Sequence, residues 1–295
     1  MFVPKGVICP IVTPFKEDGS IDEENLRKHI KYLVNNGITA ISPNAGTSEA
    51  ISLSNEEQRK VLKIVMEETK GKTFIVPGIL HPGIGNCIES IEYSKDLGVD
   101  AVMLITPYYN KPTQLGIYEY FKHLSEMSGI PIIIYNIPGR TGSNVEPFTL
   151  AKLAKLDNIV GIKECNREIG QFLEKVRLVG DKISILAGDD DVAYHMMSLG
   201  ARGGILATSN LIPDVWREIY KACQEGQFTR AETTFTKYIP LIKSLFPPDE
   251  LHPAPLKEAL GILGKMGSYT RKPVPKVNEK NRIKIKTIMD SLNLI

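Results

Sequence analysis

Short runs of apolar and β-branched residues recur along the chain and predict eight β-strands. The run Ile132-Ile133-Ile134 shows the near-continuous hydrophobicity that is typical of parallel strands covered on both faces. Between the runs, apolar residues recur with the helical period of about 3.6 residues. The predicted strands cover residues 6–14, 40–45, 73–80, 101–107, 131–138, 159–165, 183–188 and 203–208. The predicted helices include residues 23–34, 55–68, 87–97, 117–127 and 147–156.

Alternation of strand and helix predicts a parallel sheet, and eight such units favour a closed (β/α)8 TIM barrel. An open, doubly wound sheet is the alternative, but no G-x-G-x-x-G sequence follows the first strand. After about Gln224 the strand pattern ends, and three helical patterns follow over residues 228–245, 255–263 and 281–292. We therefore expect a catalytic barrel of residues 1–224 and a C-terminal helical extension of residues 225–295.

The composition excludes several classes of protein. The 295 residues are 42% hydrophobic and 24% charged, with a formal net charge of +2, so no strong basic field points to nucleic acid. No apolar run approaches the roughly 18 residues that cross a bilayer, and the first residues lack a signal-peptide pattern, so we expect a cytoplasmic protein. Cysteines and histidines lack the spacings of a disulfide framework or a metal site, so we expect neither.

Lys163 is the strongest candidate for chemistry. In a (β/α)8 barrel the active site lies at the carboxyl ends of the strands, so a polar residue that ends an apolar strand is a candidate. Lys163 follows the run Ile159-Val160-Gly161-Ile162. We expect burial to lower the pKa of its amine and to leave a nucleophile. The alternative is a structural lysine that pairs with a carboxylate such as Glu164, or that extends its ammonium to the barrel rim.

The preceding strand end supplies two further polar groups. Tyr135 lies at a similar depth, where its phenol could carry protons to and from a substrate carbonyl; a core tyrosine is the alternative. Arg140 follows on a Pro-Gly-Arg-Thr-Gly loop, where a guanidinium could bind a carboxylate through paired hydrogen bonds. A solvated loop arginine explains that position equally well.

Three motifs resemble the signatures of the dihydrodipicolinate synthase and N-acetylneuraminate lyase family. They are Thr106-Pro107-Tyr108-Tyr109, Tyr135-Asn136-Ile137-Pro138-Gly139-Arg140-Thr141-Gly142 and Gly161-Ile162-Lys163-Glu164. The likeness runs over nearly the whole chain and includes Thr13-Pro14-Phe15, Gly188-Asp189-Asp190 and Pro253-x-Pro255-x-Lys257. It implies a (β/α)8 barrel that acts as a pyruvate-dependent lyase without a cofactor or a metal.

The resemblance also implies a role for each matching residue. Lys163 would form an imine with pyruvate, Tyr135 would relay protons, and the resulting enamine would attack an aldehyde. Tyr109 matches a second tyrosine of the synthase branch that reaches across a subunit interface, which implies a homodimer or homotetramer. Arg140 would bind the carboxylate of aspartate semialdehyde, and it favours the synthase branch because the lyase branch generally lacks it. Groups near Gly188 and Ile205 would line the pocket.

The loop after the second predicted strand departs from the family pattern. The family usually has Gly-Thr-Thr-Gly-Glu there, with backbone N–H groups that hold the pyruvate carboxylate, whereas this chain has Ala45-Gly46-Thr47-Ser48-Glu49. Gly46 takes the place of the first hydroxyl, which belongs to a proton relay in the synthase branch, and Thr47 takes the place of the second. Thr47, Ser48 or a water would have to replace the missing hydroxyl, since loss of a relay member costs on the order of 10² to 10⁴ in rate.

The leading prediction is a synthase that condenses pyruvate with aspartate semialdehyde, a step toward diaminopimelate and lysine. A related pyruvate aldolase or dehydratase acting on a 2-keto-3-deoxy sugar acid is the first alternative, because the Gly46 loop is altered. A keto-acid-binding protein with decayed catalysis is the second. Two further expectations concern structure: the turn Asp189-Asp190-Asp191 caps a helix rather than binding a metal, and His252 is a structural variation.

Overall fold

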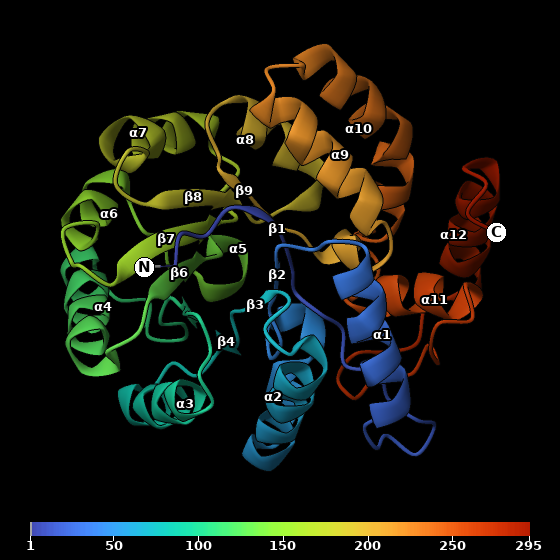
Figure 1. The fold of residues 1–295 in the computed structure, drawn as a ribbon, viewed down its shortest axis with the longest axis horizontal. Helices are drawn as coiled ribbons and strands as arrows, with labels where there is room; N and C mark the ends of the chain where they lie inside the picture. The colour runs from blue at the N-terminus through green and yellow to red at the C-terminus, as the bar shows by residue number, and fades with distance from the viewer. Residues whose placement is uncertain (1) are drawn as a thin grey trace.

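The computed structural model describes residues 2–295 and places parallel strands at the centre of a ring of helices (Figure 1). In that range the strands are β1 (Gly6–Cys9), β2 (Ala40–Ile41), β3 (Phe74–Ile75), β4 (Gly78–Ile79), β5 (Val102–Ile105), β6 (Ile132–Asn136), β7 (Ile159–Glu164), β8 (Ser184–Ala187) and β9 (Gly203–Ile205). Their order in the sheet is β3-β2-β1-β9-β8-β7-β6-β5-β4. All pairs are parallel, as predicted.

The sheet closes on itself through its two edge strands, β3 and β4, which are separated in the chain only by Val76 and Pro77. The Val76 amide donates to the Ile41 carbonyl over 2.9 Å, and the Pro77 carbonyl accepts from the Met103 amide over 2.9 Å. Residues 74–79 therefore bridge β2 and β5. Pro77 has no N–H to add to the ladder, which explains why the third predicted strand is observed as two short pieces.

The predicted strands are confirmed, although several end earlier than expected. The second was predicted over residues 40–45 but ends at Ile41. Pro43 lacks an N–H and Asn44 has a left-handed φ of 58°, so the chain leaves the sheet there. The residues beyond the strand ends become the loops of the candidate site.

Apolar side chains form two cores, one inside the barrel and one between the strands and the helices. The inner core includes Ile8, Val76, Met103, Ile133, Tyr135, Val160, Leu186 and Ile205. The outer core joins the opposite faces of the strands to the helices, as at Ile134 and Phe121. The double covering explains why these strands are apolar on both faces.

The helices alternate with the strands as the apolar period predicts. They are α1 (Glu23–Asn35), α2 (Asn55–Thr69), α3 (Ile84–Asp96), α4 (Gln114–Ser128), α5 (Pro138–Thr141), α6 (Pro147–Leu153), α7 (Ile169–Val179), α8 (Ala193–Ser198), α9 (Pro213–Gln224), α10 (Phe228–Ser244), α11 (Ala254–Ile262) and α12 (Glu279–Ser291). Short 3₁₀ helices lie in loops: η1 (Gly46–Ser48), η2 (Ala50–Ser52), η3 (Asp190–Val192) and η4 (Ala207–Asn210). Local signals set some of the starts, because Ser54 and Glu57 form a reciprocal capping box at α2.

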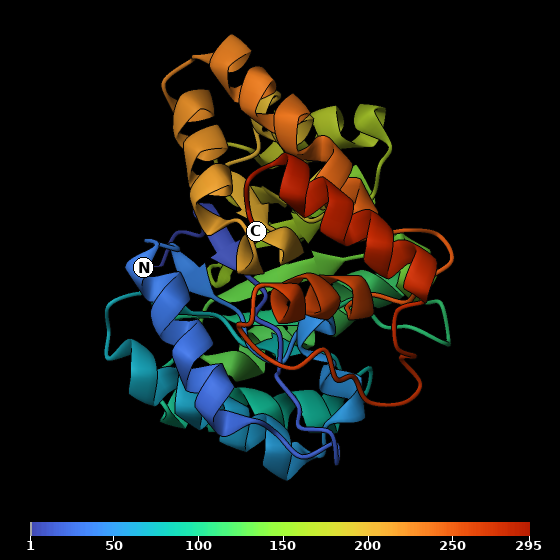
Figure 2. The same cartoon turned by 90° about the vertical axis from the view of Figure 1, so that its right-hand side faces the viewer.

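The three predicted helices of the extension are observed as α10, α11 and α12, which gather on one side of the barrel (Figures 1 and 2). Lys257 of α11 forms an ion pair with Glu49 at 2.5 Å, and the Arg271 guanidinium donates to the Ser52 carbonyl over 3.0 Å. These contacts bind the extension to the loop that contains η1 and η2. The division into residues 1–224 and 225–295 stays a prediction.

Within residues 2–295, no helix is both long enough and apolar enough to cross a membrane.

Candidate active site

A cavity at the carboxyl ends of the strands collects seven of the nine predicted site residues. It has a volume of about 140 Å³ and is lined by seven of the predicted residues: Gly46, Thr47, Tyr135, Arg140, Lys163, Gly188 and Ile205. Ser48 and Tyr109 are the two predicted residues that do not line it.

Lys163 lies directly beside Tyr135, since the two residues are register partners on β7 and β6. Its Nζ lies 4.3 Å from the centroid of the Tyr135 ring, and only 5% of the residue is exposed. Within residues 2–295 no carboxylate pairs with it; Glu164 instead pairs with Lys175 at 2.5 Å. The alternative of a structural Lys163 paired with Glu164 is therefore wrong.

Opposing effects set the charge of the Lys163 amine. Burial disfavours its ammonium form, whereas four neighbouring groups favour it: Tyr135, Cys165, Asp189 and Asp190. Burial acts in the predicted direction, but the neighbouring groups outweigh it, so the pKa of Lys163 lies above its ordinary value. Burial also raises the pKa of Tyr135. The resting pair is thus an ammonium beside a neutral phenol, and the amine must lose a proton before it attacks a carbonyl.

Arg140 lies on the short helix α5 rather than on the loop expected from its sequence. Pro138 at the first turn and Gly142, whose φ is 66°, delimit this single turn. A Cβ placed on Gly46 would lie 4.0 Å from Nη1 of Arg140, with no other neighbour within that distance. The guanidinium therefore faces the bare backbone of Gly46 across the cavity.

The loop around η1 turns its two hydroxyls in different directions. Thr47 lines the cavity, and its Oγ1 lies 3.2 Å from Nε2 of His252. Ser48 is fully buried, and its Oγ donates to the Ile11 carbonyl over 2.6 Å while accepting from the Ala45 amide. The structure therefore does not bring the Ser48 hydroxyl to the substrate. The Gly46 and Thr47 amides begin η1, where no intrahelical acceptor exists.

Behind this loop, Glu49 holds a left-handed conformation with φ 54°. Its carboxylate pairs with Lys257 and accepts from the Arg271 amide over 2.9 Å. At the base of the loop, Asn44 donates to the Gln58 carbonyl over 2.9 Å. The loop is therefore held from two sides, by α2 and by the extension.

Gly188 must be a glycine, because a Cβ there would overlap Cys165 Sγ and the Glu164 carbonyl. The aspartates that follow were predicted to cap a helix, but η3, which begins at Asp190, has no side-chain cap. Asp190 instead accepts from the Ala207 and Thr208 amides over 3.1 and 2.7 Å and so holds η4, while burial raises its pKa to about 6. Asp189 and Asp191 pair with Arg167 at the cavity mouth.

Tyr109 lies away from the cavity of its own chain. It is 91% exposed and has a left-handed φ of 72°. A contribution to a neighbouring subunit stays a prediction.

Several lining residues were not predicted, and His252 is the most informative of them. It comes from the extension, directly before the Pro253-x-Pro255-x-Lys257 motif, and lines the cavity beside Phe246. The expectation of a purely structural variation did not foresee this position. The signal was available, because the extension matches the family through that same motif. A wider, mainly apolar space continues outward past Leu251 and Val274.

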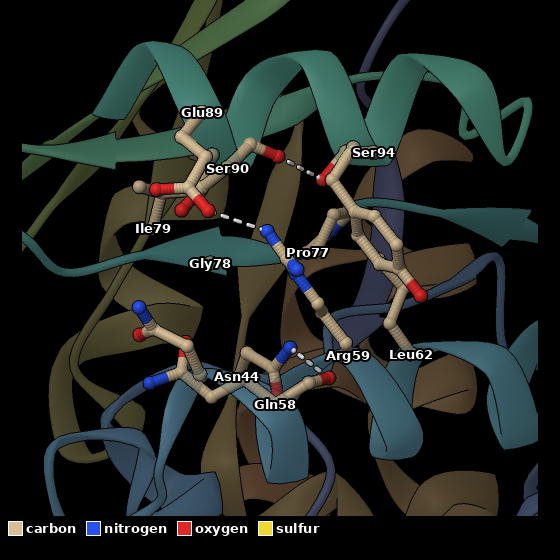
Figure 3. Close-up of a pocket in the computed structure, with 12 residues that line it drawn as sticks. Asn44, Gln58, Arg59, Leu62, Pro77, Gly78, Ile79, Glu89, Ser90 and Ser94 are labelled. Carbon is tan, nitrogen blue, oxygen red and sulfur yellow. Dashed lines mark hydrogen bonds and ion pairs between the residues drawn. The ribbon is translucent and has the colours of Figure 1, made fainter. Parts of the chain in front are cut away.

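A second hollow lies between α2 and α3 and contains none of the predicted residues (Figure 3). Arg59 of α2 reaches across it to Glu89 of α3, with 2.5 Å between Nη2 and Oε1. This ion pair ties the two helices together. We therefore assign the candidate active site to the cavity around Lys163.

The comparisons with known proteins agree with this geometry. The model of the dihydrodipicolinate synthetase family matches residues 3–292. Proteins named 4-hydroxy-tetrahydrodipicolinate synthase from Syntrophus aciditrophicus and Geotalea uraniireducens are 39% and 38% identical to the chain, each over 99% of both sequences. The crystal structure of a dihydrodipicolinate synthase from Thermotoga maritima superposes with a TM-score of 0.96 at 32% identity and covers 100% of both chains. That from Aquifex aeolicus has a TM-score of 0.95 at 35% identity and covers 99% of both. The predicted barrel is thereby confirmed.

Proposed function

The chain belongs to the dihydrodipicolinate synthetase family, and we propose that it is a 4-hydroxy-tetrahydrodipicolinate synthase that joins pyruvate to aspartate semialdehyde through an imine on Lys163. As a member of this family it is a pyruvate-dependent lyase. The observation that carries the proposal is a buried lysine amine without a carboxylate partner, in register with Tyr135 and facing the Gly46–Thr47 loop.

Imine formation is the first step. The Lys163 amine, once deprotonated, attacks the keto carbon of pyruvate and gives a carbinolamine, which loses water to form the imine. Tyr135 is placed to donate the proton that leaves with this water, because its phenol stays protonated at neutral pH. Loss of a proton from the methyl group of the bound pyruvate then gives the enamine, whose carbon attacks the aldehyde.

The carboxylates have separate binding positions in this proposal. The amides of Gly46 and Thr47, which have no intrahelical acceptor, would bind the pyruvate carboxylate, and the Thr47 hydroxyl would add a third donor. Arg140, which lies next to Gly46 in the cavity lining, binds the carboxylate of aspartate semialdehyde through its paired N–H groups.

The proposal includes assembly and cellular location. Tyr109, exposed in the single chain, would complete the site of a neighbouring subunit in a homodimer or homotetramer. A cytoplasmic enzyme fits the four free cysteines, because thiols persist in a reducing compartment.

One observation favours a second candidate, a related pyruvate aldolase or dehydratase. At Gly46 no side chain lies between the loop backbone and Arg140, and this departure from the family loop is the reason to consider another acceptor, such as a sugar-acid aldehyde. A binding protein without catalysis is not retained, because the family consists of lyases.

The test is borohydride reduction with pyruvate, followed by peptide mass spectrometry and by an assay of condensation with aspartate semialdehyde. We expect a stable adduct on Lys163, none in Lys163→Arg, and turnover with aspartate semialdehyde. An adduct on Lys163 without turnover of aspartate semialdehyde would instead favour the second candidate function. A protein that forms no adduct would reject both functions.

A further inference from the structure

His252 and Thr47 lie 205 residues apart in sequence, yet they meet in the cavity that contains Lys163. Nε2 of the imidazole is 3.2 Å from Oγ1 of Thr47, within hydrogen-bond distance. The extension thus reaches the loop that would hold the keto-acid carboxylate.

The imidazole is fixed in one orientation. Phe246 stacks on it, with 4.8 Å between ring centroids and 19° between the planes. Its other nitrogen, Nδ1, is buried and has no hydrogen-bond partner within residues 2–295. The Thr47 hydroxyl is therefore the single polar contact of this ring among the described residues.

The ring is neutral, and one tautomer suits its surroundings better. Burial, reinforced by the nearby Arg140 and Lys163 cations, lowers the pKa of His252 to about 3. A proton on Nδ1 would bury a donor without an acceptor, which is rarer in proteins than an unsatisfied acceptor. We therefore assign the proton to Nε2, which then donates to Oγ1 of Thr47.

This donation determines what the Thr47 hydroxyl can do. Its oxygen is occupied by His252, so its own proton is free to donate into the cavity, and accepting a hydrogen bond strengthens a hydroxyl as a donor. No other hydroxyl of η1 can serve, because Gly46 has none and Ser48 donates to the Ile11 carbonyl.

We propose that His252 is a positioning residue of the keto-acid site, where it holds the Thr47 hydroxyl so that its proton binds the substrate carboxylate. The inference rests on the proposed function, since it assigns a pyruvate carboxylate to this loop. It makes the C-terminal extension part of the pyruvate site. In this chain, where Gly46 takes the place of a hydroxyl residue, His252 would orient the Thr47 hydroxyl.

The test measures the pyruvate concentration that half-saturates borohydride trapping at Lys163, in the full-length protein. His252→Leu and Thr47→Val should each raise it about tenfold, the usual effect of losing one hydrogen bond to a charged group. His252→Gln should stay near wild type, because its side-chain N–H₂ can reach the position of Nε2. The double variant His252→Leu/Thr47→Val should be no weaker than Thr47→Val alone, because both changes remove the same donor.

Three results would overturn the inference: an unchanged value in His252→Leu, an unchanged value in Thr47→Val, or a double variant whose loss is the product of the single losses. Thr47→Val reports on the same bond, so the test stands even if His252→Leu does not fold. Thermal unfolding midpoints identify variants that lose structure. A wild-type protein without any Lys163 adduct would reject the proposed function and the inference with it, whereas normal wild-type trapping with an unaffected His252→Leu would reject the inference alone.

Discussion

Within residues 2–295 three lysines are buried, and they differ in what lies beside their ammonium groups. Lys175 on α7 and Lys257 on α11 are fully buried, and each forms an ion pair of 2.5 Å, with Glu164 and Glu49 respectively. Lys163 is almost as deeply buried but has an aromatic ring, not a carboxylate, beside its Nζ.

The difference shows that burial by itself does not make a lysine reactive. Glu164 accepts from Asn136 and Asn166 as well as from Lys175, so that pair is a closed network without access to a ligand. Lys257 donates to the Tyr269 carbonyl and lies 4.0 Å from the centroid of the Phe15 ring. Lys163 alone of the three lines the cavity. Among the described residues, Lys163 thus differs from the other two because its amine has no ion-pair partner and opens into the cavity, where a substrate could reach it.

The largest expected effect comes from replacing each lysine by methionine. Lys163→Met should abolish the pyruvate adduct and lower turnover by at least about 10⁴-fold, the scale seen when a nucleophile is removed. Its unfolding free energy should change by less than about 1 kcal/mol, because no carboxylate loses its partner. Lys175→Met and Lys257→Met should each lose about 3–5 kcal/mol, because each leaves a buried carboxylate unpaired. Denaturant unfolding and mass spectrometry of the trapped adduct measure the two quantities.

A matched control separates charge from packing in that experiment. The double variant Glu49→Gln/Lys257→Met should recover part of the stability that Lys257→Met loses, since the remaining amide is neutral. The contrast fails if Lys163→Met is destabilised as strongly as the other two, or if adducts form on Lys175 or Lys257.

A smaller effect measures the charge of Lys163 directly. Its pKa is raised, so between about pH 6 and pH 9 it is mainly ammonium, and the free amine increases about tenfold for each pH unit. The trapping rate at saturating pyruvate should therefore rise continuously over this range. Titration of His252 should not change the slope of the trapping rate against pH near pH 6.5, because the pKa of His252 is lowered to about 3. A His252→Leu control should show the same slope, and a plateau below about pH 8 would instead support the lowered pKa expected from burial alone.

The smallest expected effect tests whether the absence of a hydroxyl at Gly46 slows proton transfer to and from the groups around Lys163. The space beside Gly46 accepts a side chain, so Gly46→Ser should fold normally. We expect turnover to rise less than about tenfold, because the Tyr135 phenol already lies beside Lys163 to carry the proton. Gly46→Ala controls for added bulk. A rise of about 100-fold in the serine variant alone would show that the wild-type site has no replacement for the relay.

Much of the fold and of the site could be predicted from the sequence, because the relevant information is local. The apolar runs and helical periods specify the alternation of strand and helix, and a lysine at the end of an apolar strand is placed at the catalytic face by the barrel architecture. The same reasoning placed Tyr135 beside Lys163, since consecutive parallel strands pair in register. The motifs that carry the family likeness lie on these same segments.

Other features depend on which distant side chains meet, and the sequence does not specify this locally. Glu164 follows Lys163 directly, but successive strand residues face opposite sides, so Glu164 pairs with Lys175 outside the barrel. Ser48 donates to Ile11 instead of facing the substrate, and Asp190 holds η4 instead of capping η3. Each of these choices follows from packing between segments that are far apart in the chain.

The sequence by itself therefore determined the barrel and the adjacent positions of Lys163 and Tyr135 at its strand ends, because strand period and strand order place them. Only the tertiary structure decided that Lys163 has no carboxylate partner and that its pKa is raised. It also decided that His252 reaches Thr47 across 205 residues. The physical reason is that charge and hydrogen bonding in a buried site depend on every group within a few ångströms, and the closed barrel with its extension brings those groups together from the whole chain.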